Sequence, residues 1–176
     1  MLSLLHEAGS PLVSSPEPGR GSTIPRRVYL HPGQLFASRE PSAVTTILGS
    51  CVSVCLWDPS SGIGGMNHFL LPHGPEPADR RSSQRFGDAA TAALIAEIVA
   101  LGGRKSLLTA KVFGGACTAE AFVKGPIRHL GPRNVERAFA VLHREGIPVE
   151  AHHTEGRRGR KVIFHTNDGS AWVKEL

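Results

Sequence analysis

Residues 48–71 read LGSCVSVCLWDPSSGIGGMNHFLL, and this stretch decides the fold because it holds two apolar runs joined by one turn. The first run alternates apolar and small side chains over residues 52–57, which is typical of a strand. Pro59 and Gly62 mark the turn, since proline presets the backbone and glycine closes the loop. The second run continues until Pro72 ends it. The stretch therefore predicts a β-hairpin.

The hairpin brings a cysteine and a histidine together. If the loop is residues 58–61, Trp57 pairs with Gly62 and Cys51 lies opposite His68, with the side chains roughly 5 Å apart. A loop longer by one residue sets the two diagonally, and either register leaves them within reach after modest bending. A free thiol has a pKa of about 8.5, and a neighbouring imidazole can take its proton and hold the thiolate as an ion pair. Cys51 is therefore a candidate nucleophile and His68 its candidate base.

Each of these residues also has an ordinary structural explanation. Most free cysteines are small buried hydrophobic residues, and a lone histidine in an apolar strand is more often a hydrogen-bonded core residue. Gly49 and Ser50 favour the catalytic interpretation, because they let the backbone approach a substrate. We interpret Cys55, further along the same strand face, as packing, and Cys117, after a glycine pair, as structural.

The remaining pattern places two helices among further strands. Residues 89–101 are alanine-rich and apolar on nearly every side, which predicts a helix buried against a sheet, with Asp88 as its cap. Residues 134–145 carry apolar side chains on one face and end at Gly146, which predicts a second helix. A loop is expected at residues 74–85. Further strands are expected at residues 28–30, 34–38, 43–48, 107–113, 149–154, 161–166 and 171–174, with a hairpin turn at residues 167–169. This order predicts an α+β or layered α/β domain with mixed, mostly antiparallel sheets and packed helices.

Length and composition bound the class of protein. The chain has 176 residues, of which 40% are hydrophobic, enough for one domain with a core. We expect residues 1–26, rich in Ser, Pro and Gly, to form a flexible extension, and residues 27–176 to form a single domain. No apolar stretch reaches the length of a membrane span and the start lacks a basic n-region, so we expect a cytoplasmic protein without membrane insertion. The odd number of cysteines, three, indicates reduced thiols.

The charge favours an acidic partner. The formal net charge is +5, and Arg157, Arg158, Arg160 and Lys161 form a basic cluster. A solvated loop is the commonest explanation of such a cluster. Docking to an acidic protein surface ranks between that explanation and nucleic-acid binding. Aromatic residues make up only 6% of the chain, which is too few for the stacking platforms of a nucleic-acid-binding protein.

Cofactors and self-association are not indicated. The remaining histidines are scattered without the spacing of zinc ligands, so we expect no metal site. The glycine pairs at residues 64–65 and 114–115 form neither a dinucleotide-binding motif nor a Walker loop, so we assign no nucleotide or other cofactor. The chain has no sustained heptad pattern, and we therefore expect a monomer.

Several separated motifs, taken in order, resemble the signature of the CheD family of chemoreceptor glutamine deamidases. The motifs lie at residues 45–56, 62–72, 85–88, 111–116, 131–135 and 159–162, and the resemblance spans about residues 28–174. An ordered series of motifs is more specific than any one of them. The departures are minor, because Pro132 occupies a variable position and Phe86 keeps the aromatic character usual at its place.

The resemblance implies a Cys-His-Thr site on a layered α/β fold similar to that of deamidating bacterial toxins. By motif, Cys51 is the nucleophile, His68 is the general base and Thr45 orients the imidazole, with Thr46 as the alternative if the strand is shifted by one residue. The implied activity is that of a protein-glutamine glutaminase, which converts glutamines of methyl-accepting chemotaxis receptors to glutamate. A CheC-type phosphatase is a further implied partner.

Two other classes of protein remain alternatives. The first is a non-catalytic adaptor that docks receptors or a CheC-type phosphatase. The second is a cysteine protease or transglutaminase, which shares the thiol–imidazole chemistry and differs in whether a backbone amide or an added amine is processed. The short chain argues modestly against a protease.

Overall fold

The computed structural model describes residues 24–74, 84–117 and 129–176. Its helices are α2 (Gly87–Ala100) and α3 (Leu130–Arg144), with a short 3-10 helix, η1 (Lys105–Leu107). Its strands are β1 (Arg26–Tyr29), β2 (Gln34–Ser38), β3 (Ser42–Leu48), β4 (Val52–Asp58), β5 (Ile63–His68), β6 (Thr109–Gly114), β7 (Val149–Thr154), β8 (Arg160–His165) and β9 (Ala171–Glu175).

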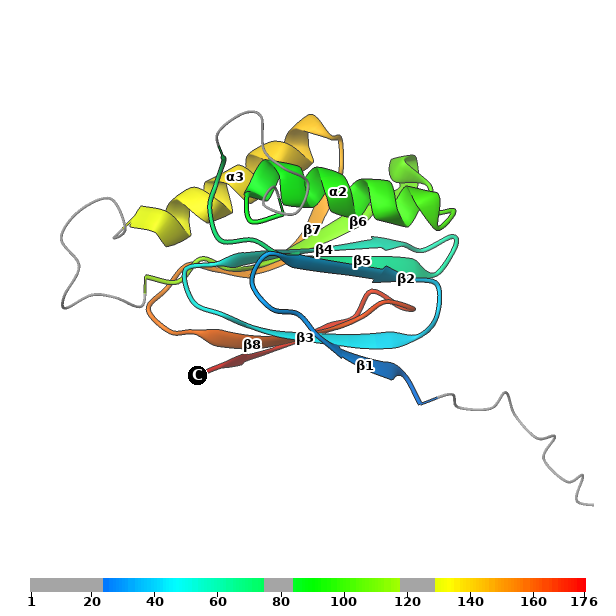
Figure 1. Ribbon diagram of the computed structural model, residues 1–176, viewed down its shortest axis with the longest axis horizontal. Coiled ribbons are helices and arrows are strands. Elements are labelled where there is room, and N and C mark those ends of the chain that lie inside the picture. The colour runs from blue at the N-terminus through cyan, green and yellow to red at the C-terminus, as the bar shows by residue number, and fades with distance from the viewer. Residues whose placement is uncertain (1–23, 75–83, 118–128) are drawn as a thin grey trace, which may run out of the picture.

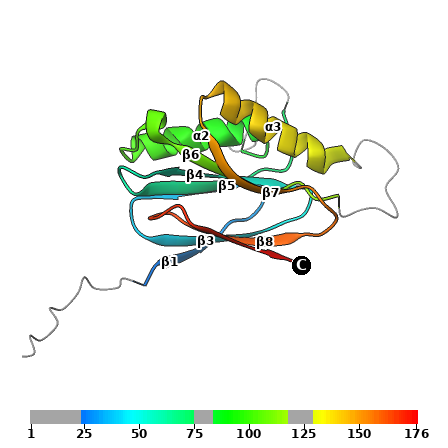
Figure 2. The same ribbon diagram turned by 180° about the vertical axis from the view of Figure 1, so that it is seen from behind.

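Two sheets stack on each other, and both helices cover one of them (Figure 1, Figure 2). The four-stranded sheet has the order β1-β3-β8-β9, and the five-stranded sheet has the order β2-β5-β4-β6-β7. The pairs β1–β3 and β6–β7 are parallel and the other pairs are antiparallel. Helices α2 and α3 pack on the five-stranded sheet and on each other. The predicted α+β architecture with mixed, mostly antiparallel sheets is confirmed.

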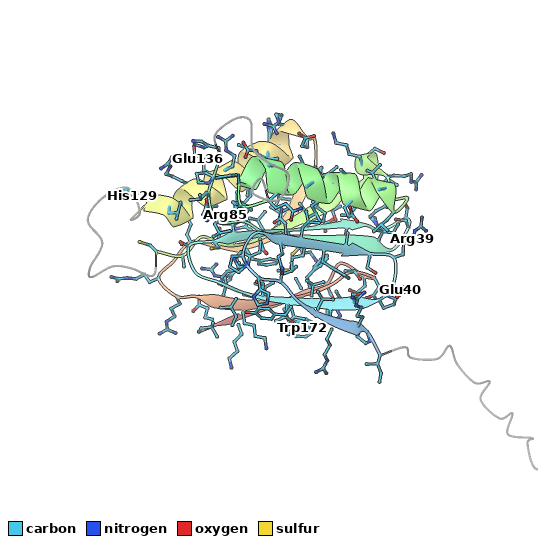
Figure 3. All side chains as sticks on the ribbon, viewed as in Figure 1. Arg39, Glu40, Arg85, His129, Glu136 and Trp172 are labelled. Carbon is cyan, nitrogen blue, oxygen red and sulfur yellow. The ribbon has the colours of Figure 1, made fainter. Side chains whose placement is uncertain are left out.

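The layers enclose two apolar cores, and side chains fill the space between the sheets (Figure 3). One core lies between the helices and the five-stranded sheet. The other lies between the two sheets and consists of Leu30, Val44, Leu48, Cys55, Met66, Phe113, Val162 and Phe164. Strands β4 and β5 belong to the middle layer, so they are buried on both faces. This explains why the stretch that contains them is apolar or small at nearly every position.

The β4–β5 hairpin forms in a register two residues away from the predicted one. Asp58, which we expected in the loop, is the last residue of β4 and pairs with Ile63. Cys51 precedes β4, and the first residue of that strand, Val52, bridges to Phe69. The predicted pairing of Cys51 directly opposite His68 is therefore wrong.

The side chain of Asp58 explains the register. Its carboxylate is buried and accepts hydrogen bonds from Ser60 Oγ at 2.6 Å, Ser61 Oγ at 2.9 Å and the backbone N–H of Arg104 at 2.8 Å. Burial alone would raise the pKa of Asp58, but these hydrogen bonds outweigh it and hold the pKa well below its usual range. The loop therefore supplies the donors that allow a charged residue to end a buried strand.

Side-chain hydrogen bonds interrupt the β4–β5 ladder near the end of β5. Asn67 is fully buried, and its Oδ1 accepts a hydrogen bond of 2.8 Å from the backbone N–H of Val54. The hydroxyl of Ser53 donates to the backbone carbonyl of Asn67. The backbone ladder resumes at the pair of hydrogen bonds between Val52 and Phe69, which measure 3.0 and 3.1 Å. Two side chains, those of Asn67 and Ser53, thus substitute for the missing backbone partners.

The predicted helices are confirmed, with two differences at their starts. Helix α2 follows Phe86, whose side chain makes no capping hydrogen bond, and Asp88 lies in the first turn instead of at the cap. Helix α3 begins four residues before the predicted residue 134, because Gly131 packs directly against the backbone of Gly115 and Ala116. Gly169, with φ of +68°, lies in the predicted turn between β8 and β9.

Parts of two predictions lie outside the described residues. Of the expected N-terminal extension, residues 1–23 lie outside the described residues and residues 24–26 lie within them. Strand β1 begins at Arg26. The expected loop at residues 74–85 falls there over residues 75–83. Within the described ranges, the helices are too short or too polar to cross a bilayer.

Candidate active site

Cys51 lies in the short loop that carries the chain from the four-stranded sheet to the five-stranded sheet. The loop follows Leu48, the last residue of β3, and ends where β4 begins. Hydrogen bonds of 2.8 Å hold its carbonyl groups toward β6, because Ala116 N donates to Gly49 O and Gly115 N donates to Cys51 O. The thiol itself is half-buried and borders the core between the sheets. The loop is thus fixed on one side and leaves its thiol accessible.

Asn134, from α3, completes this fixation. It is fully buried, and its Nδ2 donates to the carbonyl of Ser50 at 3.0 Å and to the carbonyl of Leu70 at 2.8 Å. The amide orientation is settled, since a flipped amide would set its oxygen against both carbonyls. One side chain therefore joins the loop that carries Cys51 to the segment that follows His68.

The fixed carbonyls orient the N–H groups of the loop. In a trans peptide the carbonyl of one residue and the N–H of the next point in opposite directions. Since the carbonyls of Gly49 and Ser50 point toward β6 and α3, the N–H groups of Ser50 and Cys51 point the other way. Neither N–H has a backbone acceptor within the described ranges. The N–H of Cys51 faces its own thiol. These N–H groups can donate hydrogen bonds to an oxyanion that forms beside the sulfur.

His68 ends β5 and is almost completely buried, at 2% exposure. Its Nδ1 lies 2.8 Å from Thr46 Oγ1, and the Thr46 hydroxyl donates to the backbone carbonyl of Leu30 at 2.9 Å. Because the hydroxyl proton is committed to Leu30, Thr46 Oγ1 accepts from the ring, so Nδ1 carries the proton. The lone pair then resides on Nε2, which is buried and has no hydrogen-bond partner among the described residues. This nitrogen is available to act as a base.

The contact with the histidine ring comes from Thr46 and not from Thr45. Successive side chains of a strand point to opposite faces of the sheet. Thr46 is fully buried between the sheets, whereas Thr45 is half-buried and lies on the outer face of β3. The structure therefore favours Thr46, the alternative that the sequence left open, over Thr45 as the residue that orients the imidazole.

Cys51 and His68 lie at the same end of the inter-sheet core without a hydrogen bond between them. The side chain of Cys51 packs against the cluster that contains Met66, two residues before His68 on β5. The pairing of Val52 with Phe69 places the two functional residues diagonally across the ladder. In unliganded sites catalytic hydrogen bonds are often long and tighten when a substrate binds. Diagonal neighbours on one face of a ladder lie about 7–8 Å apart, so a proton transfer requires the thiol to move toward the ring.

Burial favours the neutral form of both groups. It raises the pKa of the Cys51 thiol, and the residue's own backbone N–H only partly opposes this effect. It lowers the pKa of His68 to about 4, and the hydrogen bonding that connects the ring to Leu30 opposes this shift. At neutral pH the resting pair is therefore a thiol and a neutral imidazole. The thiolate–imidazolium pair expected from the sequence would form only as the thiol reacts.

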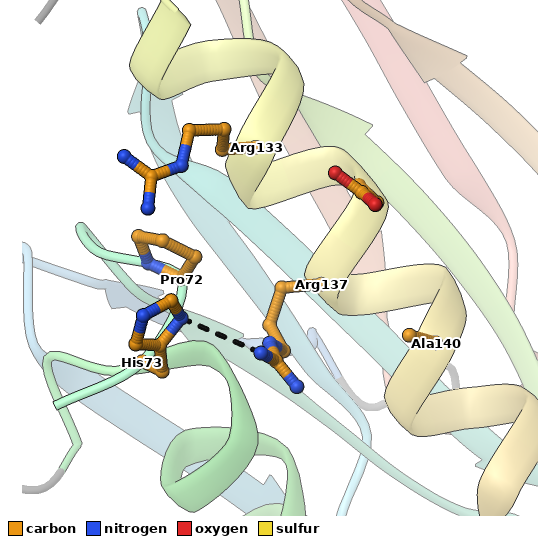
Figure 4. Close-up of a pocket in the computed structure, with 6 residues that line it drawn as sticks. Pro72, His73, Arg133, Arg137 and Ala140 are labelled. Carbon is orange, nitrogen blue, oxygen red and sulfur yellow. Dashed lines mark hydrogen bonds between the residues drawn. The ribbon is translucent and has the colours of Figure 1, made fainter. Parts of the chain in front are cut away.

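A cavity of about 280 Å³ lies between α3 and the segment that follows β5, and its lining includes none of Cys51, His68 and Thr46. It is lined by Pro72, His73, Arg133, Glu136, Arg137 and Ala140. Figure 4 shows Arg133 and Arg137 on α3 turned toward Pro72 and His73, and Arg137 Nη2 lies 3.4 Å from His73 Nδ1. Neither arginine forms an ion pair with another described residue. The lining thus combines two arginines with one carboxylate, that of Glu136.

The other thiols and the other described histidines do not form a second centre within the part of the chain that the structure describes. Cys55 is buried in the inter-sheet core, and burial raises the pKa of its thiol far above the usual value. The backbone N–H of Cys117 donates to Gly156 O at 2.8 Å. Across residues 24–74, 84–117 and 129–176, no three His, Cys, Asp or Glu side chains are grouped to hold a metal ion.

Sequence reasoning missed Asn134 and Asn67. Asn134 belongs to the motif at residues 131–135, and that motif was the only signal that could have pointed to it. Nothing in the sequence around Asn67 indicates that its side chain would replace a ladder hydrogen bond.

Comparisons with known proteins support one family. The family model described as CheD chemotactic sensory transduction matches residues 70–175. The probable chemoreceptor glutamine deamidase CheD 1 of Anaeromyxobacter dehalogenans is 49% identical over 159 residues, which cover 90% of this chain and 89% of that protein. Proteins named probable chemoreceptor glutamine deamidase CheD from Trichlorobacter lovleyi and Rhodospirillum rubrum are 42% and 40% identical, over 85% and 84% of this chain and 89% and 81% of their own lengths.

Replacing Asn134 tests the fixation of the loop. Asn134→Leu leaves the carbonyls of Ser50 and Leu70 unpaired and lowers the free energy of unfolding by about 1–3 kcal/mol, as urea denaturation will measure. Because the loop is then less constrained, iodoacetamide alkylates Cys51 faster, as peptide mapping by mass spectrometry will show. Thr166→Val is the matched control, since it also breaks two hydrogen bonds of 3.0 and 3.1 Å, at the far end of β8. Equal alkylation rates in both variants would contradict this role of Asn134.

The buried imidazole makes stability depend on pH. The pKa of His68 falls from 6.5 to about 4 on folding, so the unfolded chain binds the proton more strongly. Lowering the pH from about 6.5 to 4 therefore removes up to about 3 kcal/mol of stability, and the loss ends below pH 4. Urea denaturation across this window measures it. His68→Gln lacks this part of the slope, whereas the exposed His73→Gln keeps it. An identical slope in wild type and His68→Gln would refute the assignment.

Proposed function

Because the chain belongs to the CheD family, we propose that it acts in chemotaxis by hydrolysing the side-chain amide of glutamine residues in chemoreceptors. The observation that carries the proposal is the buried, unpartnered Nε2 of His68, held as a base at the end of the inter-sheet core that Cys51 borders. A deamidase of this kind needs a nucleophile, a base and donors for an oxyanion. Cys51, His68 and the N–H groups of the Cys51 loop are suited to these roles.

The first half of the reaction forms a thioester. As the sulfur of Cys51 attacks the carboxamide carbon, its proton moves to Nε2 of His68 and the electron pair of the C=O double bond moves to oxygen. The N–H of Ser50, with that of Cys51, donates to the resulting oxyanion, and such a donor is typically worth about 2.7–4 kcal/mol. The intermediate collapses with cleavage of the C–N bond, and the imidazolium gives its proton to the departing ammonia. The acyl group remains on the sulfur.

The second half releases glutamate. A water molecule attacks the thioester carbon while Nε2 of His68 takes one of its protons. Collapse of the second intermediate breaks the C–S bond and returns that proton to the sulfur of Cys51. Thr46 keeps the same ring nitrogen available in both halves, because it continues to accept from Nδ1–H. These steps use only side chains and backbone groups of the protein itself.

The low pKa of His68 keeps the ring neutral before each proton transfer, although it also makes the ring a weak base toward the thiol. A neutral base is needed at the start of each half, and His68 with a pKa of about 4 is neutral at pH 7. The imidazolium formed after each proton transfer is strongly acidic in its buried position, so it readily protonates the leaving group. The thiol carries no charge until the carboxamide arrives, which limits its reaction with other electrophiles.

The charges of the protein suit an acidic protein substrate. The net charge of +5 favours encounter with an acidic receptor surface. The cavity lined by α3 adds Arg133 and Arg137, which have no ion-pair partners among the described residues, beside one carboxylate, Glu136. The net charge and the two arginines favour encounter and docking of the substrate. The chemical step is carried out by the thiol.

Loss of the thiol is the direct test of the reaction. Cys51→Ala abolishes the conversion of glutamine to glutamate in a folded chemoreceptor fragment, as mass spectrometry of the fragment will show. Cys55→Ala is the matched control, because that thiol is buried and its pKa is strongly raised, so the variant retains activity. If Cys51→Ala and wild type give identical spectra of the folded receptor fragment, the deamidase proposal fails.

Replacing Thr46 tests the orientation of the base. Thr46→Val removes the acceptor for Nδ1–H, so the ring loses its preferred tautomer and kcat falls by about 10- to 100-fold with little change in KM. Nitrogen NMR of the imidazole reports the tautomer directly. Thr45→Val is the matched control, since its side chain lies on the other face of β3. A larger loss of kcat in Thr45→Val than in Thr46→Val would contradict the proposal.

A further inference from the structure

Among the described residues, no layer covers the outer face of the four-stranded sheet. Both helices pack on the other sheet, so no described helix lies against this face (Figure 1, Figure 2). Side chains alternate along each strand, and those that face inward fill the inter-sheet core. The outward side chains are Arg27, Tyr29, Ala43, Thr45, Ile47, Lys161, Ile163, His165, Trp172 and Lys174. We call this set the outer face.

A row of four residues crosses the middle of the outer face. Tyr29 pairs with Thr45, Thr45 with Ile163, and Ile163 with Trp172, so one residue from each strand lies in the row. Tyr29 is 49% exposed and Trp172 is 69% exposed, although both are large and largely apolar. Trp172 lies on the side of this sheet that faces away from the helices (Figure 3). Exposed apolar side chains gathered in this way mark an interaction site.

Cations flank this row on both sides. On one side Ile47, Lys161 and Lys174 lie in register, and on the other side lies Arg27. Lys161 and Lys174 are directly opposite each other, an arrangement that destabilises a sheet through repulsion. Neither has an ion-pair partner in the described part of the chain. The folded protein gains no stability from placing two lysines opposite each other. An acidic partner bound to them would gain attraction from both charges.

The charges of the outer face also decide what it can bind. The strands contribute no carboxylate to it, and Asp168, which adjoins His165 in the β8–β9 turn, lies at the end away from the two lysines. A second copy of this chain would therefore set lysine against lysine. The row spans about 14 Å across four strands, which matches two to three turns of an α-helix. A helix with an apolar stripe that is bordered by carboxylates on both sides is complementary to this apolar row and its flanking cations.

We propose that the outer face docks an acidic amphipathic helix of the chemoreceptor, a role that rests on the proposed function. The position of the face supports this partner. The row of lysines adjoins the end of β3, and the loop that carries Cys51 follows three residues later. A long helical substrate can therefore contact the outer face and present a glutamine to the thiol in the same complex. Arg160, in the same basic cluster of the sequence, is buried and takes no part.

Fluorescence of Trp172 tests docking without reference to catalysis. The chain contains two tryptophans, so Trp57→Phe leaves Trp172 as the reporter. Titration with a purified cytoplasmic fragment of a chemoreceptor will shift its emission to shorter wavelength in a saturable manner. Lys161→Glu with Lys174→Glu weakens this binding at least about tenfold. Arg39→Glu with Arg104→Glu is the matched control, because both arginines are exposed elsewhere on the protein, and it leaves binding unchanged.

Deamidation kinetics supply the second measurement. Trp172→Ala raises KM for the receptor fragment at least about tenfold, as expected for a buried aromatic contact, and leaves kcat unchanged. Its activity on a short glutamine-containing peptide stays that of the wild type. Leu107→Ala, which removes an exposed apolar side chain outside the outer face, changes neither constant.

The outcomes separate this inference from the proposed function. If no substrate is deamidated, the proposed function fails, and the fluorescence titration still decides whether the face docks the fragment. Docking is overturned if the lysine variants bind the fragment as tightly as wild type. It is also overturned if Trp172 emission shifts with vesicles of anionic phospholipid but not with the fragment, because the face would then bind membranes.

Discussion

The interaction on which the site depends is the chain of hydrogen bonds from His68 Nδ1 through the Thr46 hydroxyl to the carbonyl of Leu30. His68 belongs to one sheet and Thr46 to the other, so this chain joins the two layers in their buried interface. The carbonyl can only accept, and this single fact fixes the hydroxyl, then the ring proton, and finally the position of the lone pair. A backbone group thus determines which nitrogen can act as the base.

Around these hydrogen bonds, the fold restrains Cys51, the proposed nucleophile, from the opposite side. The turn after β6 and Asn134 of α3 hold the carbonyls of the Cys51 loop, while the sheets hold the histidine. Both reacting groups are neutral at rest because burial disfavours their charged forms. The protein therefore combines a neutral thiol with a fixed imidazole, and the N–H of Cys51 already faces the sulfur.

The sequence was sufficient for the elements and insufficient for the contacts between them. Alternation and turn residues predict the β4–β5 hairpin, but its register depends on Asp58, whose burial is permitted only by donors that the folded loop supplies. Thr45 and Thr46 are equivalent by residue type, and only the facing sheet distinguishes them. Asn134 lies on a predictable helix, yet the carbonyls that it binds come from residues 64 and 84 positions away in the chain.

The distribution of the site over both sheets and a late helix has a consequence for biosynthesis. Leu30, Thr46, Cys51, His68 and Asn134 are all needed to place the thiol and its base, so a nascent chain that has not yet produced α3 carries an ordinary cysteine. Reactivity is then acquired in the same step as the final tertiary structure. The arrangement around the thiol therefore does not exist before the chain has folded through α3.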